Sequence, residues 1–244
     1  MASPVLLDRF GTLLYADALA WMRDAHAALA AGGPERLALL QHDPVYTIGA
    51  RGADGGGREH LLVPAAELAA RGAALEQVDR GGDITFHGPG QLVAYPVLDL
   101  RRRGLRAADY VRALEATVIG ALRAVGVPAE GIPGRPGVWT AGGRPGGTPE
   151  KIAAVGVRIR RGISQHGLAL NVSTDLGWFD AIVPCGIRDA GVTSLERVLG
   201  RRVPIAEAEA ALARAFEQRF DATLVEEEPG AGARPAAAAV AGRG

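Results

Sequence analysis

Apolar residues recur at spacings of three and four in several segments of the chain, which is the pattern of amphipathic helices. The clearest case covers residues 107–125, where the apolar positions run from Val111 to Val125 and Gly126 follows as an end signal. The same pattern, bounded by glycine or proline, predicts further helices over residues 17–31, 64–71 and 204–220. We expect these four helices to form the scaffold and to carry no chemistry.

Short runs of apolar and β-branched residues between these helices predict strands. The strands are expected over residues 37–40, 75–78, 92–99, 138–140, 152–159 and 167–172. Several follow one another without a helix between them, and Arg160-Arg161-Gly162 gives the last two a hairpin spacing that implies antiparallel pairing. The predicted fold class is therefore α/β, with a mixed, largely antiparallel sheet flanked by helices.

The composition is that of a globular chain, with 48% hydrophobic and 22% charged residues over 244 positions. We expect a single domain over residues 1–225. From Glu226 the sequence reads EEEPGAGARPAAAAVAGRG, which has no aromatic residue and predicts a disordered tail over residues 226–244. The start, MASPVLLDRF, is charged too early for a signal peptide, and no stretch approaches the ~18 apolar residues of a membrane span. A cytoplasmic location is expected.

The charges balance, with 27 Lys and Arg against 27 Asp and Glu. Because no net field attracts polyanions, neither a nucleic acid nor a membrane is expected as a partner. A charged partner would have to meet a local patch. Two arginine clusters are candidates, residues 101–103 with Arg106 and the group Arg158, Arg160 and Arg161, although a solvated face explains both equally well.

The chain has one cysteine and one lysine, and both contexts favour chemistry. Because Cys185 is the single cysteine, an intramolecular disulfide is excluded. Cys185 lies between Pro184 and Gly186, a turn context that favours an exposed, reactive thiol. Lys151 stands alone against 26 arginines. Arginine replaces lysine as a surface charge but not as a proton carrier, so the retained lysine favours a chemical role over chance.

Residues 80–91 read RGGDITFHGPGQ, in which glycine and proline bracket a short strand, Ile84 to Phe86. Glycine at such points either makes a turn or lets a ligand approach the backbone. The His87-Gly88-Pro89-Gly90 run beside Arg80 and Asp83 favours binding. The segment matches neither a Walker phosphate loop nor a G-x-G-x-x-G fingerprint, so a nucleotide site is weakly supported.

Small residues follow two adjacent predicted strands. Strict alternation places Lys151 with Ala153 and Val155 on one face of the first strand, and Ala154 and Gly156 on the other. Gly167 and Ala169 share one face of the next strand, opposite His166 and Leu168. The four small residues either line a slot for a slender apolar ligand or permit tight packing, and the sequence favours neither reading.

None of the five histidines has a metal-binding spacing, so no metal site and no cofactor are expected. A zinc site formed by Cys185 and two histidines is the less favoured reading. A free thiol is mostly protonated at neutral pH, and a nearby cation favours the reactive thiolate. Lys151, His87 and His166 are the candidate partners of Cys185.

Together, these segments resemble the lipoyl(octanoyl) transferase family, the octanoyltransferases of lipoate biosynthesis. The matching pieces are HDPVYTIG from His42, RGGDITFHGPGQLVAYPVLDL from Arg80, KIAAVGVRIRRGISQHGLALNV from Lys151, and PCGI around Cys185. They cover roughly residues 40 to 190. The resemblance implies the fold of the biotin and lipoate ligase catalytic domains.

The resemblance also implies an activity. Such an enzyme transfers an octanoyl group from octanoyl-acyl carrier protein, through a cysteine thioester, to a lysine ε-amine on the lipoyl domains of 2-oxoacid dehydrogenase E2 subunits and on the glycine cleavage H protein. By resemblance, Cys185 is the acyl-accepting nucleophile and Lys151 is paired with it. The implied substrate pocket comprises Arg80, Gly81, Gly82, Asp83, Ile84, Thr85, Phe86, His87, Ala154, Val155, Gly156, His166, Gly167, Leu168 and Ala169.

Two alternatives remain at this stage. An ATP-dependent lipoate or biotin ligase would share the fold and would use the glycine-rich segment for an acyl-adenylate, without needing a cysteine. A non-catalytic module that binds acyl groups would need neither Cys185 nor Lys151. The presence of Cys185 favours the transferase.

Overall fold

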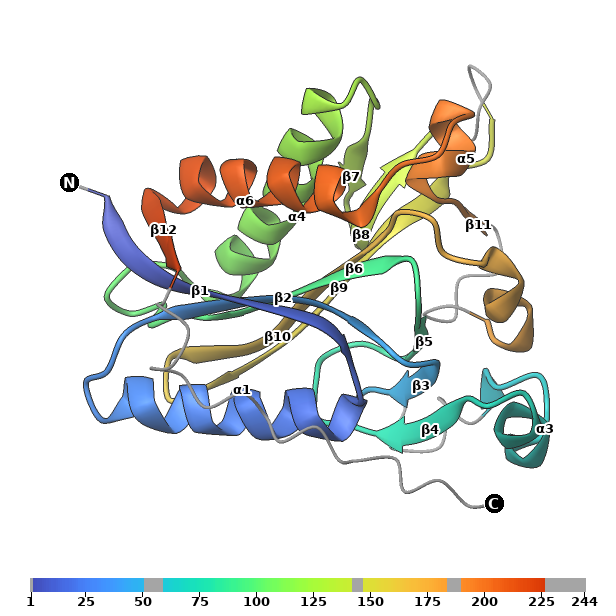
Figure 1. Cartoon of the computed structure of the whole chain (residues 1–244), viewed down its shortest axis with the longest axis horizontal. Coiled ribbons are helices and arrows are strands. Elements are labelled where there is room, and N and C mark those ends of the chain that lie inside the picture. The colour runs from blue at the N-terminus through green and yellow to red at the C-terminus, as the bar shows by residue number, and fades with distance from the viewer. Residues whose placement is uncertain (1, 51–58, 142–146, 184–189, 227–244) are drawn as a thin grey trace.

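The computed structural model of the chain describes residues 2–50, 59–141, 147–183 and 190–226. Within these ranges a large sheet has nine strands: β1 (Ser3–Leu13), β2 (Arg36–His42), β6 (Gln91–Val97), β7 (Glu130–Ile132), β8 (Arg135–Thr140), β9 (Glu150–Arg160), β10 (Ile163–Asn171), β11 (Gly191–Val192) and β12 (Ala222–Glu226). Their order is β12-β1-β2-β6-β10-β9-β8-β7, with β11 beside β9 (Figure 1). Pairs from β2 to β7 along this order are antiparallel, whereas β1 runs parallel to both β2 and β12. The predicted mixed, largely antiparallel sheet is confirmed.

Helices cover both faces of this sheet (Figure 1). Helix α1 (Tyr15–Ala30) lies on one face, while α4 (Ala107–Ala124) and α6 (Ile205–Phe220) pack together on the other. The buried stripe of α1 is Ala18, Met22, Ala25 and Leu29, at spacings of four, three and four residues. Burying a side chain the size of Leu29 stabilises the fold by about 1.5–3 kcal/mol, so this stripe fixes which side of α1 faces the sheet.

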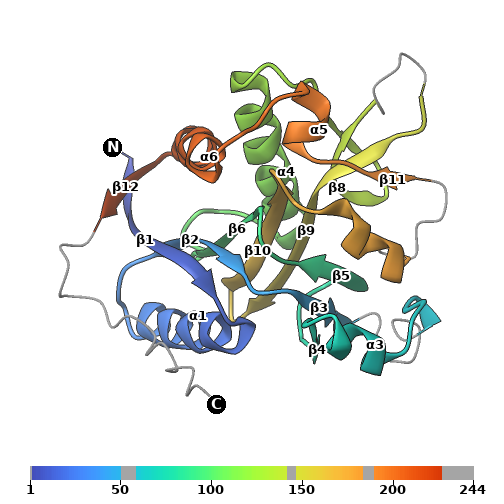
Figure 2. The same ribbon diagram turned by 45° about the vertical axis from the view of Figure 1, so that its right-hand side comes forward.

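A second, three-stranded sheet lies beside the large one (Figure 2). Its strands are β3 (Val45–Ile48), β4 (Ala74–Gln77) and β5 (Ile84–His87), in the order β4-β3-β5. Helix α3 (Ala65–Ala70) and the 3-10 helix η2 (Leu176–Ala181) pack on it around Tyr46 and Phe86. Helix α5 (Leu195–Leu199) precedes α6. The predicted helices and strands are all present with ends shifted by a few residues, but β1, β3, β7, β11, β12, α5 and η2 were not predicted.

Strand β9 breaks the strict alternation expected from the sequence. It pairs with β8 through Val138–Ala153 and Trp139–Lys151, so Ile152 is an extra residue, a β-bulge. Ile152 and Ala153 consequently both join the core against α4 and α6, whereas Lys151 lines a small cavity together with Ala154. The expectation that Lys151 faces away from Ala154 is therefore wrong, because the bulge inverts the alternation between them.

The two arginine clusters meet at one end of the large sheet. The Leu100 backbone N–H donates to the Gly162 carbonyl at 2.8 Å, and the space beside Gly162 is occupied by the Arg101 side chain. This end lies about nine residues along β9 from Lys151, which corresponds to roughly 30 Å. A partner on these arginines would therefore lie far from Lys151.

Arg103 does not belong to this exposed surface. Its guanidinium pairs with Glu35 and donates to the Phe220 carbonyl at 2.6 Å, and its side chain is only 11% exposed. Glu35 also accepts the Asp99 backbone N–H at 2.9 Å. The proposed cluster of residues 101–103 is corrected accordingly, because Arg103 joins the entry to β2, the exit from β6 and the end of α6.

No helix within the described ranges has both the length and the apolar composition needed to cross a membrane. Strand β12 ends at Glu226, and residues 227–244 lie outside the described residues, so the tail remains a prediction.

The Arg103–Glu35 pair gives the first testable prediction. Arg103→Ala should lower the free energy of unfolding by roughly 3 kcal/mol, because it leaves a largely buried Glu35 carboxylate without its partner. Chemical denaturation measures this loss. Arg102→Ala is the matched control, since Arg102 is 66% exposed and its removal should cost under about 1 kcal/mol. Equal losses in the two variants would contradict a structural role for Arg103.

Candidate functional site

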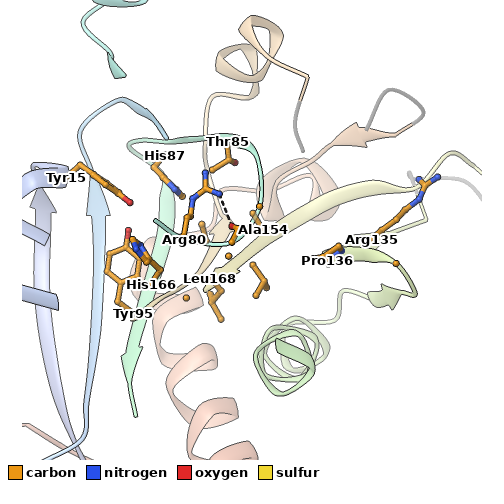
Figure 3. A pocket seen from close by; sticks show the side chains of 17 residues that line it. Tyr15, Arg80, Thr85, His87, Tyr95, Arg135, Pro136, Ala154, His166 and Leu168 are labelled. Atoms are coloured by element: carbon orange, nitrogen blue, oxygen red, sulfur yellow. Dashed lines mark hydrogen bonds between the residues drawn. The ribbon is translucent and has the colours of Figure 1, made fainter. Parts of the chain in front are cut away.

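A cavity lies between the large sheet and the segment that leads into β5 (Figure 3). Strands β9 and β10 form its floor, and residues 80–87 cover it. All but three of the pocket residues expected from the sequence line this one cavity. The exceptions are Asp83, Ile84 and Phe86. The structure thus brings three distant sequence segments together.

Two of the three exceptions, Ile84 and Phe86, follow from the alternation of β5. Thr85 and His87 face the cavity, so Ile84 and Phe86 point to the opposite side, into the core of the small sheet. There the Phe86 ring stacks on Trp178 with a centroid distance of 5.1 Å. Asp83 pairs with His60 at the start of the strand. These residues support the cavity wall without lining it.

The floor consists of two small cross-strand pairs, Ala154–Ala169 and Gly156–Gly167. Close packing accounts for the glycines, because a Cβ on Gly156 would lie 2.9 Å from the Gly81 carbonyl oxygen. Gly167 likewise leaves room for the Ala94 carbonyl. Close backbone packing therefore requires both glycines. All four small residues line the cavity. The slot for an apolar ligand stays a prediction.

Arg80 occupies a space that glycines leave for it. A Cβ on Gly49 or Gly82 would lie 2.7 or 3.1 Å from Arg80 Nη1, and one on Gly156 would lie 3.2 Å from its Cδ. The guanidinium donates to the Thr47 carbonyl at 2.6 Å and to Thr47 Oγ1 at 2.7 Å. Arg80 is 7% exposed. The arrangement fixes a cation in the cavity wall.

Lys151 is the second residue of β9 and is 6% exposed. Its Nζ lies 4.7 Å from the centre of the Trp139 ring, an arrangement that attracts an ammonium group. Gly137, at φ +119°, leaves the space along the lysine stem, because a Cβ there would lie 3.2 Å from Lys151 Cε. The small cavity beside Lys151 shares Thr85, Ala154 and Ala169 with the large one, so the two adjoin.

Cys185 lies within residues 184–189, outside the described residues, so its expected position beside Lys151 stays a prediction. The described chain resumes at Ala190, and two residues later Val192 pairs with Lys151 through β11. The Thr193 backbone N–H then donates to the Lys151 carbonyl at 3.0 Å.

Tyrosines and histidines gather at one end of the cavity, where Figure 3 shows Tyr15, Tyr95 and His166 together. His42 contacts the rings of Tyr15 and Tyr95 and is fully buried. Tyr15, His42 and Tyr95 were not predicted for the site. His42 and Tyr95 fall within motifs that the sequence analysis quoted, but Tyr15 begins a scaffold helix and carries no sequence signal. Arg135 and Pro136 at the other end were also missed.

The hydrogen bonds define the tautomers of these histidines. His42 Nδ1–H donates to the Leu13 carbonyl at 3.1 Å, so its Nε2 accepts from the Tyr95 hydroxyl at 2.8 Å. His87 Nδ1–H donates to Gln91 Oε1 at 2.7 Å. His166 Nε2–H donates to Asp79 Oδ1 at 3.0 Å, which leaves Nδ1 as an acceptor.

Burial keeps these rings neutral. It lowers the pKa of His42 to about 4, against the hydrogen bond to Leu13. Burial, with His42 and Arg80 nearby, holds the pKa of His87 well below its usual value. The pKa of His166 is also lowered by burial, although Asp79 opposes the shift. At neutral pH this end of the cavity is polar but its imidazoles are uncharged.

The depressed pKa of His42 predicts a pH-dependent stability. The unfolded chain binds a proton near pH 6.5 and the folded chain only near pH 4, so stability is lost as the pH falls through this interval. His42 alone should remove about 2 kcal/mol of unfolding free energy between pH 7 and pH 5. Denaturation at both pH values, compared with His42→Gln, isolates this contribution. Equal pH slopes in the two proteins would contradict it.

Within the described ranges, no group of three or more His, Cys, Asp and Glu side chains is arranged to hold a metal ion.

Comparison with known proteins places this geometry in a family. A model of the lipoyl protein ligase A/B catalytic domain matches residues 14–217. The octanoyltransferase of Geobacter metallireducens is 43% identical over 221 residues, which are 90% of this chain and 95% of that protein. That of Mycolicibacterium paratuberculosis is 43% identical over 241 residues and 97% of each chain.

The structural likeness agrees. A bipartite lipoate protein ligase from Thermoplasma acidophilum, described with its E2 lipoyl domain, has a TM-score of 0.67 and 21% identity, covering 93% of this chain and 87% of that one. This likeness confirms the expected lipoate ligase fold and concerns the fold alone. With the family model spanning most of the chain and relatives at 43% identity, the chain belongs to the lipoyl protein ligase A/B catalytic-domain family and, within it, to the octanoyltransferases.

Proposed function

We propose that this acyltransferase moves an octanoyl group from octanoyl-acyl carrier protein to Cys185 as a thioester, and then to a lysine ε-amine on a lipoyl domain, with Lys151 carrying the protons. The observation that carries the proposal is the position of Lys151, buried where a small cavity adjoins the larger one. Relatives at 43% identity are octanoyltransferases, whereas the likeness to a ligase is 21% identical, which favours transfer over ATP-dependent ligation.

The larger cavity suits an acyl chain. Its floor consists of the small apolar residues Ala154, Gly156, Gly167 and Ala169. This floor leads away from Lys151 along β9 and β10. Each methylene buried there contributes about 0.8 kcal/mol. The carbonyl would lie near Thr85, which borders both cavities.

The reaction consists of two acyl exchanges. First, the Cys185 thiolate attacks the carbonyl carbon of the donor thioester, a new C–S bond forms, and the donor thiolate leaves with a proton from Lys151. Second, the neutral acceptor amine attacks the Cys185 thioester, the amide C–N bond forms, and the amine proton passes through Lys151 to the departing Cys185 sulfur. A thioester is already activated, so no nucleotide is required.

Both partners follow from this chemistry. The donor must present an octanoyl thioester, and the acceptor must present a lysine ε-amine on a lipoyl domain, the kind of domain described with the T. acidophilum ligase. The thiol must stay reduced between turnovers, which fits the reducing environment of the cytoplasm.

The nucleophile is tested by intact mass. Incubation with octanoyl-acyl carrier protein should add one octanoyl group to the wild type, and neutral hydroxylamine should remove it because thioesters are labile to this reagent. Cys185→Ser should show no hydroxylamine-labile adduct while it keeps the wild-type melting temperature. A requirement for ATP would instead indicate a ligase, and wild-type labelling of the variant would exclude Cys185.

The proton carrier is tested by Lys151→Arg, which keeps the positive charge. Overall transfer should fall at least about a hundredfold, since arginine stays protonated and general acid-base catalysis contributes roughly 10² to 10⁴. Lys151→Gln separates the two roles of the lysine. If charge alone matters, the arginine variant should be much the more active of the two; if proton transfer matters, both should be comparably inactive. Arginine activity within threefold of the wild type would remove Lys151 from the mechanism.

A further inference from the structure

We infer that the acyl cavity ends in a hydrogen-bonding site, formed by Tyr15 and His166, which recognises the last position of the acyl chain and favours a terminal hydroxyl over a methyl group. The inference rests on the proposed function, because it takes the acyl chain to run from Lys151 along the cavity floor. It adds a specificity site for chains that carry a polar ω-substituent.

The distances along the floor fit an eight-carbon chain. The pairs Ala154–Ala169 and Val157–His166 are three residues apart on β9 and β10, which corresponds to roughly 10 Å. A fully extended octanoyl group spans roughly 9 Å, given carbon–carbon bonds like those of the backbone. A carbonyl placed near Thr85 and Ala154 therefore puts the terminal carbon beside His166.

Two buried polar atoms at this end have no hydrogen-bond partner within the described residues, the Tyr15 hydroxyl and His166 Nδ1. Tyr15 is 5% exposed and His166 is 3% exposed. The Tyr15 hydroxyl lies beside Tyr95 (Figure 3), whose own hydroxyl donates to His42 Nε2 at 2.8 Å. Unpaired buried polar atoms are costly, so their presence on the lining of one cavity indicates an occupant with complementary groups.

The chemistry of the two atoms specifies that occupant. The Tyr15 hydroxyl is a donor, and His166 Nδ1 is an acceptor because Nε2–H is committed to Asp79. A hydroxyl group both donates and accepts, so one hydroxyl can satisfy both atoms. An alkyl chain of the same length covers them and leaves both unpaired.

The backbone at His166 supports a dedicated role. His166 has φ +56° within β10, a left-handed conformation that residues other than glycine rarely adopt. The Asp79 hydrogen bond holds the imidazole, which also borders a neighbouring groove lined by Met22 and Val78. Strained backbone of this kind is typical of functional positions.

The experiment compares two chains of equal length. Nonanoyl and 8-hydroxyoctanoyl thioesters differ only by a terminal methyl or hydroxyl, and octanoyl thioester serves as the reference. In the wild type, kcat/KM for transfer of 8-hydroxyoctanoyl should exceed that of nonanoyl at least tenfold. Tyr15→Phe should reduce this ratio at least fivefold.

Tyr110→Phe is the matched control. Tyr110 is another buried tyrosine, but it lies in α4, away from the cavity, and its loss should leave the ratio unchanged. Melting temperatures show whether each variant is folded. A wild-type preference for nonanoyl, or an unchanged ratio in folded Tyr15→Phe, would overturn the inference.

Binding of the free acids keeps this test independent of the reaction. Calorimetry with 8-hydroxyoctanoate and nonanoate requires no turnover, and the hydroxy acid should bind more tightly to the wild type. If no acyl thioester is transferred but this preference holds, the proposed function fails and the site stands. If octanoyl is transferred and nonanoate binds more tightly, the site fails and the proposed function stands.

Discussion

The burial of one guanidinium between two sheets is the constraint on which the site depends. Arg80 reaches from the segment before β5 to Thr47 on β3, and it lies against Gly156 on β9. The Gly81 N–H donates to the Val157 carbonyl at 2.8 Å, so the same segment is attached to the large sheet. Because Gly49, Gly82 and Gly156 together leave room for this side chain, the small sheet can lie close enough to β9 and β10 to enclose a cavity.

The electrostatics of the cavity follow from this arrangement. Deep burial disfavours protonated imidazoles, and the fixed cation at Arg80 adds to this effect at His87 and His166, so His42, His87 and His166 act as neutral hydrogen-bonding groups. In the proposed mechanism the proton chemistry is thereby left to Lys151, which lines the small cavity that adjoins the floor at Ala154 and Ala169. On the proposed function, one end of the cavity serves recognition and the end near Lys151 serves the reaction.

The sequence predicts the elements that depend on local pattern. The spacing of apolar residues predicts α1, α4 and α6, and the glycine-rich motif predicts the cavity wall. Sequence pattern does not predict features that depend on pairing between distant strands. The bulge at Ile152 arises from the register between β8 and β9, so alternation alone assigned Lys151 to the wrong face. Arg103 reads as a surface charge until the fold brings Glu35 and Phe220 beside it.

Tyr15 could not be identified as a site residue, since only the packing of α1 against the sheet brings it to the cavity. Lone tyrosines at helix starts carry no distinguishing pattern. The three predicted residues that miss the cavity, Asp83, Ile84 and Phe86, were included because the motif was read as a continuous unit. The two-residue repeat of β5 turns Ile84 and Phe86 into the core of the small sheet, whereas Asp83, just before the strand, pairs with His60.

The parallel pairing of β1 with β12 has a consequence for the order in which the protein is made. Ser3 pairs with Ala222, so one side of the first strand stays open until more than 200 further residues have been synthesised. An open strand edge is a template for association with other chains. Nascent chains on neighbouring ribosomes therefore present β1 as an edge for association, and release of the C-terminal residues closes that edge.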